Sequence, residues 1–196
     1  MIETRKWLPW LALFLAMAVP VIAAAFSPYL AWRRPVYIIA GFAGIAGFTL
    51  MLAQPLLANG MMPGLTRFKS RQVHTWLGGL IVAGVIIHVI GLYITSAPDV
   101  VDALLFSSPT PFAPWGVGAM VAIFAAAGLL MLRNRIRPRH WRLAHTLLVT
   151  AAVIGTIVHV LLIEGTMEFF TKWLLSAAVL IALAIAVFQL QRRVRR

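Results

Sequence analysis

The sequence predicts an all-α protein, an integral membrane six-helix bundle with both termini in the cytoplasm, and three observations lead to this prediction. First, 62% of the 196 residues are hydrophobic and only 11% are charged, whereas a soluble domain is about half apolar and a quarter charged. Second, the apolar residues form blocks of the length that a helix needs to span a bilayer, about 20 residues. Third, the basic residues lie between these blocks or at their ends. Because backbone groups in lipid must satisfy their own hydrogen bonds, the spans are expected to be helices.

Six blocks are predicted to span the membrane: residues 7–25, 36–57, 73–94, 115–132, 141–163 and 173–190. The first has the basic start and small residues of a signal peptide, but its apolar run is longer than a typical signal core, so we expect a retained anchor. The seven tryptophans all lie near span ends, as in an aromatic belt. After the third span, Asp99 could cap a short helix on the outer surface, and the alternative is that this segment is only a connector.

Lysine and arginine predict the orientation, since cytoplasmic loops carry an excess of them. One set of segments holds 14 of the 17 basic residues: Arg5, Lys6, Arg67, Lys69, Arg71, Arg133, Arg135, Arg137, Arg139, Arg142, Arg192, Arg193, Arg195 and Arg196. The opposite set holds only Arg33, Arg34 and Lys172, together with four of the five acidic residues. We therefore expect a multi-pass protein of the cell membrane, the inner membrane in a bacterium. The net charge of +12 is assigned to topology, with membrane lipid and not nucleic acid as the partner.

Four of the five histidines form two pairs with the same spacing. His74 and His88 lie fourteen residues apart in the third span, and His145 and His159 lie fourteen apart in the fifth. Fourteen residues are nearly four helical turns, so the two rings of a pair point to nearly the same side, about 21 Å apart along the helix. The two spans run in the same direction. His74 is therefore expected at the depth of His145, near the cytoplasm, and His88 at the depth of His159, near the outside.

The two histidine-bearing spans are similar in sequence as well. A shift of 71 positions superposes residues 71–89 on 142–160 with nine identities in nineteen positions. Each segment reads R-x-x-H-x13-H, with a glycine four residues before the second histidine. We interpret the segments as two helices that present the same face to a shared object.

Polar groups within lipid are costly and usually functional, so the four histidines are expected to form a site. The spacing of the two pairs indicates which kind of site. Zinc needs about four ligands around one ion, which pairs separated by about 21 Å do not supply. Without cysteine there is no thiolate ligand, disulfide or cysteine nucleophile. A proton relay stays open, although such relays usually include intramembrane carboxylates. Two metals at different depths, each with two axial imidazoles, fit the spacing, and heme iron accepts such ligands. We therefore predict two hemes, each bound by one histidine of each span.

Two glycines are candidates for contact with the hemes. Gly84 and Gly155 lack side chains one turn from His88 and His159, so a flat macrocycle could approach the backbone there. Helix–helix packing through small residues explains the same glycines equally well.

Arginines are candidates for binding the heme propionates, because a guanidinium pairs with carboxylates through a planar fork. Arg71 and Arg142 lie three residues before the inner histidines, on the same helix face, and His140 is a further candidate. Topology alone explains these charges too. Arg33 and Arg34 lie on the side where basic residues are rare, and contact with the outer propionates would explain this exception.

The motifs RQVH-x13-H and WRLAH-x13-H resemble the ferric reductase-like transmembrane domain family. That family includes iron reductases, NADPH oxidase membrane domains and the heme subunit of the periplasmic methionine sulfoxide reductase system. The likeness covers nearly the whole chain in span count, but its specific motifs lie within residues 71–89 and 139–159. The resemblance implies a six-helix bundle with b-type heme between two helices. It also implies the metal ligands: His74 with His145 for the inner heme, and His88 with His159 for the outer heme.

Ferric reductases and NADPH oxidases carry a cytoplasmic FAD and NAD(P)H domain after the last helix. Here the sequence ends at QRRVRR without a glycine-rich nucleotide loop, so residues 1–196 are expected to form a single transmembrane heme-binding domain without bound FAD or NAD(P)H. Electrons would come from a separate flavoprotein or from quinol. An acidic flavoprotein could dock on the basic residues 133–142.

The predicted function is that of a transmembrane oxidoreductase component, which carries electrons to an external acceptor such as ferric iron or a periplasmic reductase partner. One alternative is a quinol-oxidising respiratory cytochrome b, although the Pro-Glu-Trp-Tyr motif of that type is absent. Another is a heme-free transporter or scaffold, which leaves the duplicated histidine spacing unexplained.

Overall fold

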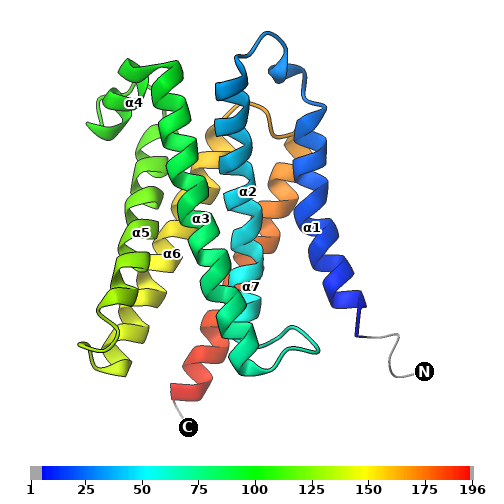
Figure 1. Ribbon diagram of the computed structural model, residues 1–196, viewed down its shortest axis with the longest axis vertical. Coiled ribbons are helices and arrows are strands. Elements are labelled where there is room, and N and C mark those ends of the chain that lie inside the picture. Colours follow the sequence, from blue (N-terminus) through cyan, green and yellow to red (C-terminus); the bar gives the residue numbers. More distant parts are fainter. Residues whose placement is uncertain (1–5, 195–196) are drawn as a thin grey trace. The chain divides into compact units, whose positions relative to one another are not determined.

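The computed structural model describes residues 6–194, and this part of the chain is helical without β-strands (Figure 1). Its α-helices are α1 (Leu8–Ala25), α2 (Pro35–Ala58), α3 (Arg67–Thr95), α4 (Ala97–Leu104), α5 (Ala113–Met131), α6 (Pro138–Leu162) and α7 (Phe169–Val194). A short 3-10 turn, Pro28–Leu30, separates α1 from α2. Within the described residues, every helix except α4 is long and apolar enough to cross a membrane, which makes six candidate spans. The prediction of an all-helical membrane protein with six spans is confirmed.

The observed helices extend beyond the predicted apolar blocks mainly where polar residues flank these blocks. α3 begins at Arg67, six residues before its predicted span, because Arg, Lys and Gln are good helix formers and continue the helix past the apolar stretch. α2 and α6 begin with Pro35 and Pro138. Proline is favoured in a first turn because its missing N–H would have no intrahelical partner there.

The short helix after α3 is present as α4, but its N-cap differs from the prediction. Ser96 is the N-cap residue, and Asp99 lies in the first turn. The Ser96 Oγ donates a hydrogen bond of 2.6 Å to the Asp99 carboxylate. The prediction that Asp99 is the cap is therefore wrong, although its negative charge still lies at the helix N-terminus, where it is favourable.

Contacts along the chain define two compact units, which are described separately. The first unit contains the residues up to 31, residues 45–81 and the residues from 166 onward. Its core includes Ala53, Leu57 and Met62, against which side chains of α1 and α3 pack. α1 and α7 are also in contact.

A tight turn after α2 fixes where α3 begins in this unit. Gly60 has a φ of 65°, a left-handed conformation that glycine adopts without strain. The Met61 N–H donates to the Leu56 carbonyl and the Gly60 N–H to the Leu57 carbonyl, as in a Schellman motif. The buried Ser70 hydroxyl of α3 donates to the Leu57 carbonyl at 2.7 Å, so the start of α3 is tied to the end of α2.

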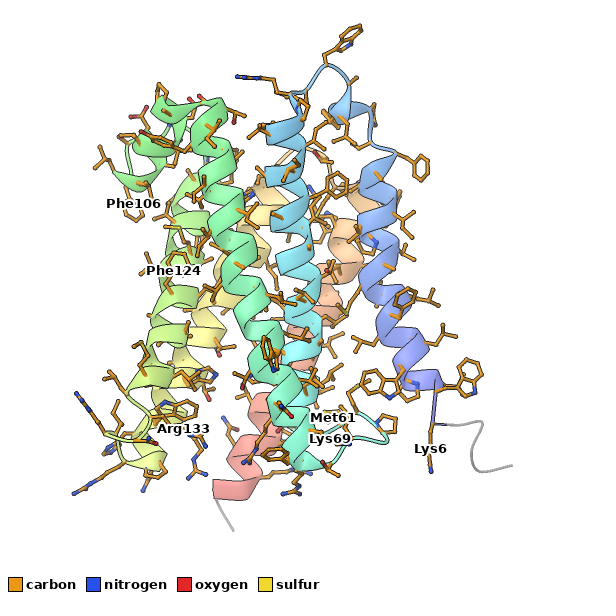
Figure 2. The ribbon with its side chains drawn as sticks, viewed as in Figure 1. Lys6, Met61, Lys69, Phe106, Phe124 and Arg133 are labelled. Carbon is orange, nitrogen blue, oxygen red and sulfur yellow. The ribbon has the colours of Figure 1, made fainter. Side chains whose placement is uncertain are left out.

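The second unit contains residues 32–44 and 82–165. In it α5 and α6 form a closely packed hairpin (Figure 1). A Cβ added at Gly155 of α6 would lie 3.1 Å from the Trp115 carbonyl oxygen and from the Ala119 Cβ of α5. Figure 2 shows Phe106 and Arg133 at opposite ends of α5, with nitrogen-tipped side chains gathered at the Arg133 end.

Many large apolar side chains are exposed on the helices of both units. Ile39 of α2, Ile90 of α3 and Ile181 of α7 are each more than half exposed. A water-soluble monomer rarely exposes extended apolar surface. Such faces are stable in contact with lipid chains, which agrees with the six candidate spans.

Candidate functional site

All four paired histidines lie inside long continuous helices and are partly buried. His74 and His88 are in α3, and His145 and His159 are in α6. The helical rise of 1.5 Å per residue separates the members of each pair by about 21 Å along their helix. His140 differs, because it is exposed in the first turn of α6.

Through Nδ1, His74 and His88 bind backbone carbonyls of α2, and His159 binds the carbonyl of the residue that caps α5. The distance from Nδ1 to the carbonyl oxygen is 2.8 Å from His88 to Ala40, 2.9 Å from His159 to Phe112 and 3.2 Å from His74 to Gln54. A carbonyl oxygen can only accept a hydrogen bond, so Nδ1 must carry the proton in each ring. In the neutral tautomer, Nε2 then keeps its lone pair, and this is the state in which a histidine ligates a metal.

The rings of His88 and His159 each pack against the backbone of a glycine, and we call these two glycines, Gly44 and Gly116, the glycine seats. Neither was predicted from the sequence. A Cβ added at Gly44 would lie 2.8 Å from Nδ1 of His88, and one added at Gly116 would lie 2.6 Å from Nδ1 of His159. Each ring therefore lies directly against the backbone of a glycine. In both cases the carbonyl that accepts the Nδ1 proton belongs to the residue four positions before that glycine.

The two seats extend the internal repeat to a second pair of helices. Gly44 and Ala40 of α2 correspond to Gly116 of α5 and to Phe112, the N-cap residue of α5. The shift is 72 positions, close to the shift of 71 between α3 and α6. Residues 40–44 and 112–116 share only the glycine at corresponding positions. The repeated unit is thus a pair of helices whose likeness is visible mainly in the structure.

His88 and His159 lie in the same unit of the structure, each toward the C-terminal end of its helix. The His159 ring also packs edge-on against the Phe112 ring, with 5.7 Å between centroids. The C-terminal parts of the two histidine-bearing helices therefore each contribute one imidazole to the second unit.

The inner histidines have different surroundings. His74 and Gln54 make a reciprocal pair, in which the Gln54 Nε2 donates to the His74 carbonyl at 3.3 Å and the Gln54 carbonyl accepts from His74 Nδ1. His145 stacks on Trp141, with the rings 5.1 Å apart and 6° from parallel. The Trp141 indole is itself fixed, because its N–H donates to the Leu129 carbonyl at 3.0 Å. Since His74 and His145 belong to different units, their pairing stays a prediction.

The other residues predicted to bind heme are two arginines and two glycines. Arg71 and Arg142 are exposed, and Arg71 lines a small pocket with Arg67 beside the C-terminal end of α2. Gly84 is partly exposed on α3. Gly155 lies against Trp115 and Ala119 of α5, a contact that agrees with helix packing through small residues. The heme-binding roles of the arginines, Gly84 and Gly155 stay predictions.

The donor set fits a heme better than a metal ion bound by protein alone. Among the residues that the structure describes, no three His, Cys, Asp or Glu side chains come together as ligands of one ion. A bis-histidine heme needs only two protein ligands for each iron, because the porphyrin supplies the others. The Nδ1 bonds of His74, His88 and His159 match the usual outer-shell support of a metal-bound histidine, whose second ring nitrogen donates to a carbonyl or a carboxylate.

Fold and site together define a multi-pass helical membrane protein with two repeated spans that carry histidines. The chain belongs to the Ferric reductase like transmembrane component family, which matches residues 40–156, more than half of its length. The matched segment includes both glycine seats and three of the four paired histidines, and His159 follows three residues after its end. No curated protein and no solved structure matches the chain. The predicted family is confirmed, and it associates the chain with membrane electron transfer by transmembrane oxidoreductase components.

Proposed function

We propose that this chain is a di-heme b-type cytochrome that carries electrons from a donor on the cytoplasmic side of the membrane to an acceptor outside. The main support is the matched geometry of His88 and His159. Each donates its Nδ1 proton to a carbonyl, rests on a glycine and keeps Nε2 for a ligand. When bound, heme supplies the one-electron change of its iron.

The residues of this chain bind and orient the two hemes. His88 with His159 would hold the outer group, and His74 with His145 the inner group. The carbonyl partners of Nδ1 fix the ring orientation and raise the basicity of Nε2, which strengthens it as a ligand. Trp141 fixes the plane of His145 by stacking. Arg71 and Arg142 would bind the inner propionates through paired N–H donors.

Gly84 would leave room for the outer heme, whereas Gly155 keeps α5 close to α6 and so supports the position of His159. Within the apolar spans, water would be largely excluded from these sites. A low local polarity strengthens every electrostatic contact to the bound group and influences its potential.

The charge distribution supports a cytoplasmic location of both termini. In this orientation the basic segment 133–142 faces the cytoplasm, where an acidic flavoprotein could dock by charge complementarity. A quinol in the membrane is the other candidate donor. Ferric iron or a periplasmic reductase subunit would accept the electrons, and a bacterial inner membrane is the expected location.

A reduced-minus-oxidised absorption spectrum of the purified chain, combined with a heme count, tests this proposal. We expect the α-band of a b-type cytochrome and two hemes per chain. His140→Ala is a suitable control, because His140 is exposed and should leave both hemes in place. A folded but colourless chain, purified from cells supplied with heme, would refute the proposal in favour of a heme-free transporter or scaffold.

A further inference from the structure

Arg33 and Arg34 lie on the side of the membrane where the charge distribution predicts few basic residues. The proposed function assigns no role to either of them. Both are exposed and directly precede α2. The Arg33 guanidinium lies over the Tyr37 ring, 4.7 Å from its centroid. Trp32 before them is fully exposed, and tryptophan favours the membrane–water interface. We therefore expect the two positive charges of this segment to lie at the depth of the lipid headgroups.

An apolar groove begins one helical turn from Arg33. It has a volume of about 240 Å³ and is lined by Val36, Ile39 and Ala40 of α2 and by α3 between Ile87 and Ile94. Gly91 forms part of its floor, where a Cβ would lie 2.7 Å from the Ala40 Cβ, so the two helices nearly touch. Figure 1 shows these parts of α2 and α3 side by side. From Ile87 to Ile94 the groove extends about 10 Å along α3. This length is a third of the roughly 30 Å hydrocarbon core of a bilayer.

We propose that Arg33, Arg34 and this groove form a binding site for one anionic phospholipid. The phosphate pairs with the two guanidinium groups, whose planar N–H donors fit phosphate oxygens. The upper part of one acyl chain lies in the groove. A phospholipid has this same order of groups, a charged headgroup directly above an apolar chain. Charge complementarity favours a lipid with net negative charge, such as phosphatidylglycerol, over zwitterionic phosphatidylcholine.

Native mass spectrometry of the whole chain in mild detergent measures the binding of one added lipid. We expect phosphatidylglycerol to bind more tightly than phosphatidylcholine. Arg33→Gln should weaken phosphatidylglycerol binding about fivefold, and Arg33→Gln with Arg34→Gln about 30-fold, from the usual effect of one basic residue at an anionic surface. Arg135→Gln with Arg137→Gln is the matched control for loss of two charges and should leave this binding unchanged.

A second variant tests the groove itself. Ile90→Trp fills the groove on a lipid-facing position and should weaken phosphatidylglycerol binding, whereas Ile154→Trp on α6 should not. A site for free phosphate would be insensitive to Ile90→Trp and saturated by inorganic phosphate, and this result would overturn the proposal. Equal binding of the two lipids, or binding unchanged in the double arginine variant, would also overturn it. So would loss of heme from that variant with unchanged lipid binding, because the arginines would then belong to the outer propionates.

Discussion

The seat of His88 on Gly44 can be tested by adding a single methyl group. In Gly44→Ala the new Cβ would lie 2.8 Å from Nδ1 and 3.1 Å from Cε1 of His88, whereas ordinary contacts begin at 3.4 Å. The ring must therefore move by about 0.6 Å. This displacement disrupts the 2.8 Å hydrogen bond to the Ala40 carbonyl. Gly41→Ala is the matched control, because a Cβ there meets nothing within 4 Å.

The magnitude follows from three contributions to the free energy of unfolding. Alanine in place of glycine stabilises a helix by about 1 kcal/mol, and both variants gain this equally. Only Gly44→Ala loses a hydrogen bond, worth about 1 kcal/mol, and crowds the ring at a further ~1 kcal/mol. We expect Gly44→Ala to be less stable than Gly41→Ala by about 2 kcal/mol. Changes in the outer shell of a metal ligand typically weaken metal binding about 10–100-fold, and we expect a loss of heme affinity in this range.

The assay measures heme per chain, heme affinity and unfolding of both variants in the same detergent. Gly44→Ala should lose or weaken one heme while Gly41→Ala keeps two. Gly116→Ala should affect the same heme through His159, with Gly118→Ala as its control, since a Cβ at Gly118 also meets nothing within 4 Å. If Gly44→Ala and Gly41→Ala bind heme equally well, the glycine seat does not position a ligand and the reasoning is refuted.

Three further predictions concern the histidines, the orientation of the chain in the membrane and Glu168, the residue directly before α7. In spectra of single variants, His88→Ala and His159→Ala should lose the same heme, and His74→Ala and His145→Ala the other; a shared phenotype of His88→Ala and His145→Ala would contradict the depth assignment. Alkaline phosphatase fused after α4 should be active and fused at the C-terminus inactive, and the reverse pattern would invert the proposed orientation. The backbone N–H groups of Thr171 and Phe170 hold the pKa of Glu168 below its ordinary value. Because this pKa is lowered on folding, Glu168 stabilises the chain at pH values above its unfolded pKa, and this contribution is lost as the pH falls through the lower folded pKa. Thermal unfolding should therefore separate wild type from Glu168→Gln at neutral pH but not in strong acid.

Much of the candidate site was predictable, because lipid restricts the options for a chain. An apolar block of about 20 residues in a bilayer has to satisfy its own backbone hydrogen bonds, so the six apolar blocks of the sequence predicted six helices. The fourteen-residue spacing of the histidines has a fixed meaning once the helix is known. The N-cap residue of α4 was predicted wrongly. Ser96 and Asp99 are both favourable residues at a helix start, and only their local geometry distinguishes them.

The sequence by itself determined the membrane class, the six spans, the paired histidines and the family. Only the tertiary structure decided what each imidazole touches. The Gly44 and Gly116 seats lie on helices that share almost nothing else at corresponding positions, and Trp141 stacks on His145 in addition to its expected place at a span end. The physical reason is the range of the interactions. Hydropathy and helical periodicity act along one segment, whereas the hydrogen bond from an imidazole to a carbonyl 48 residues away depends on how two helices approach each other.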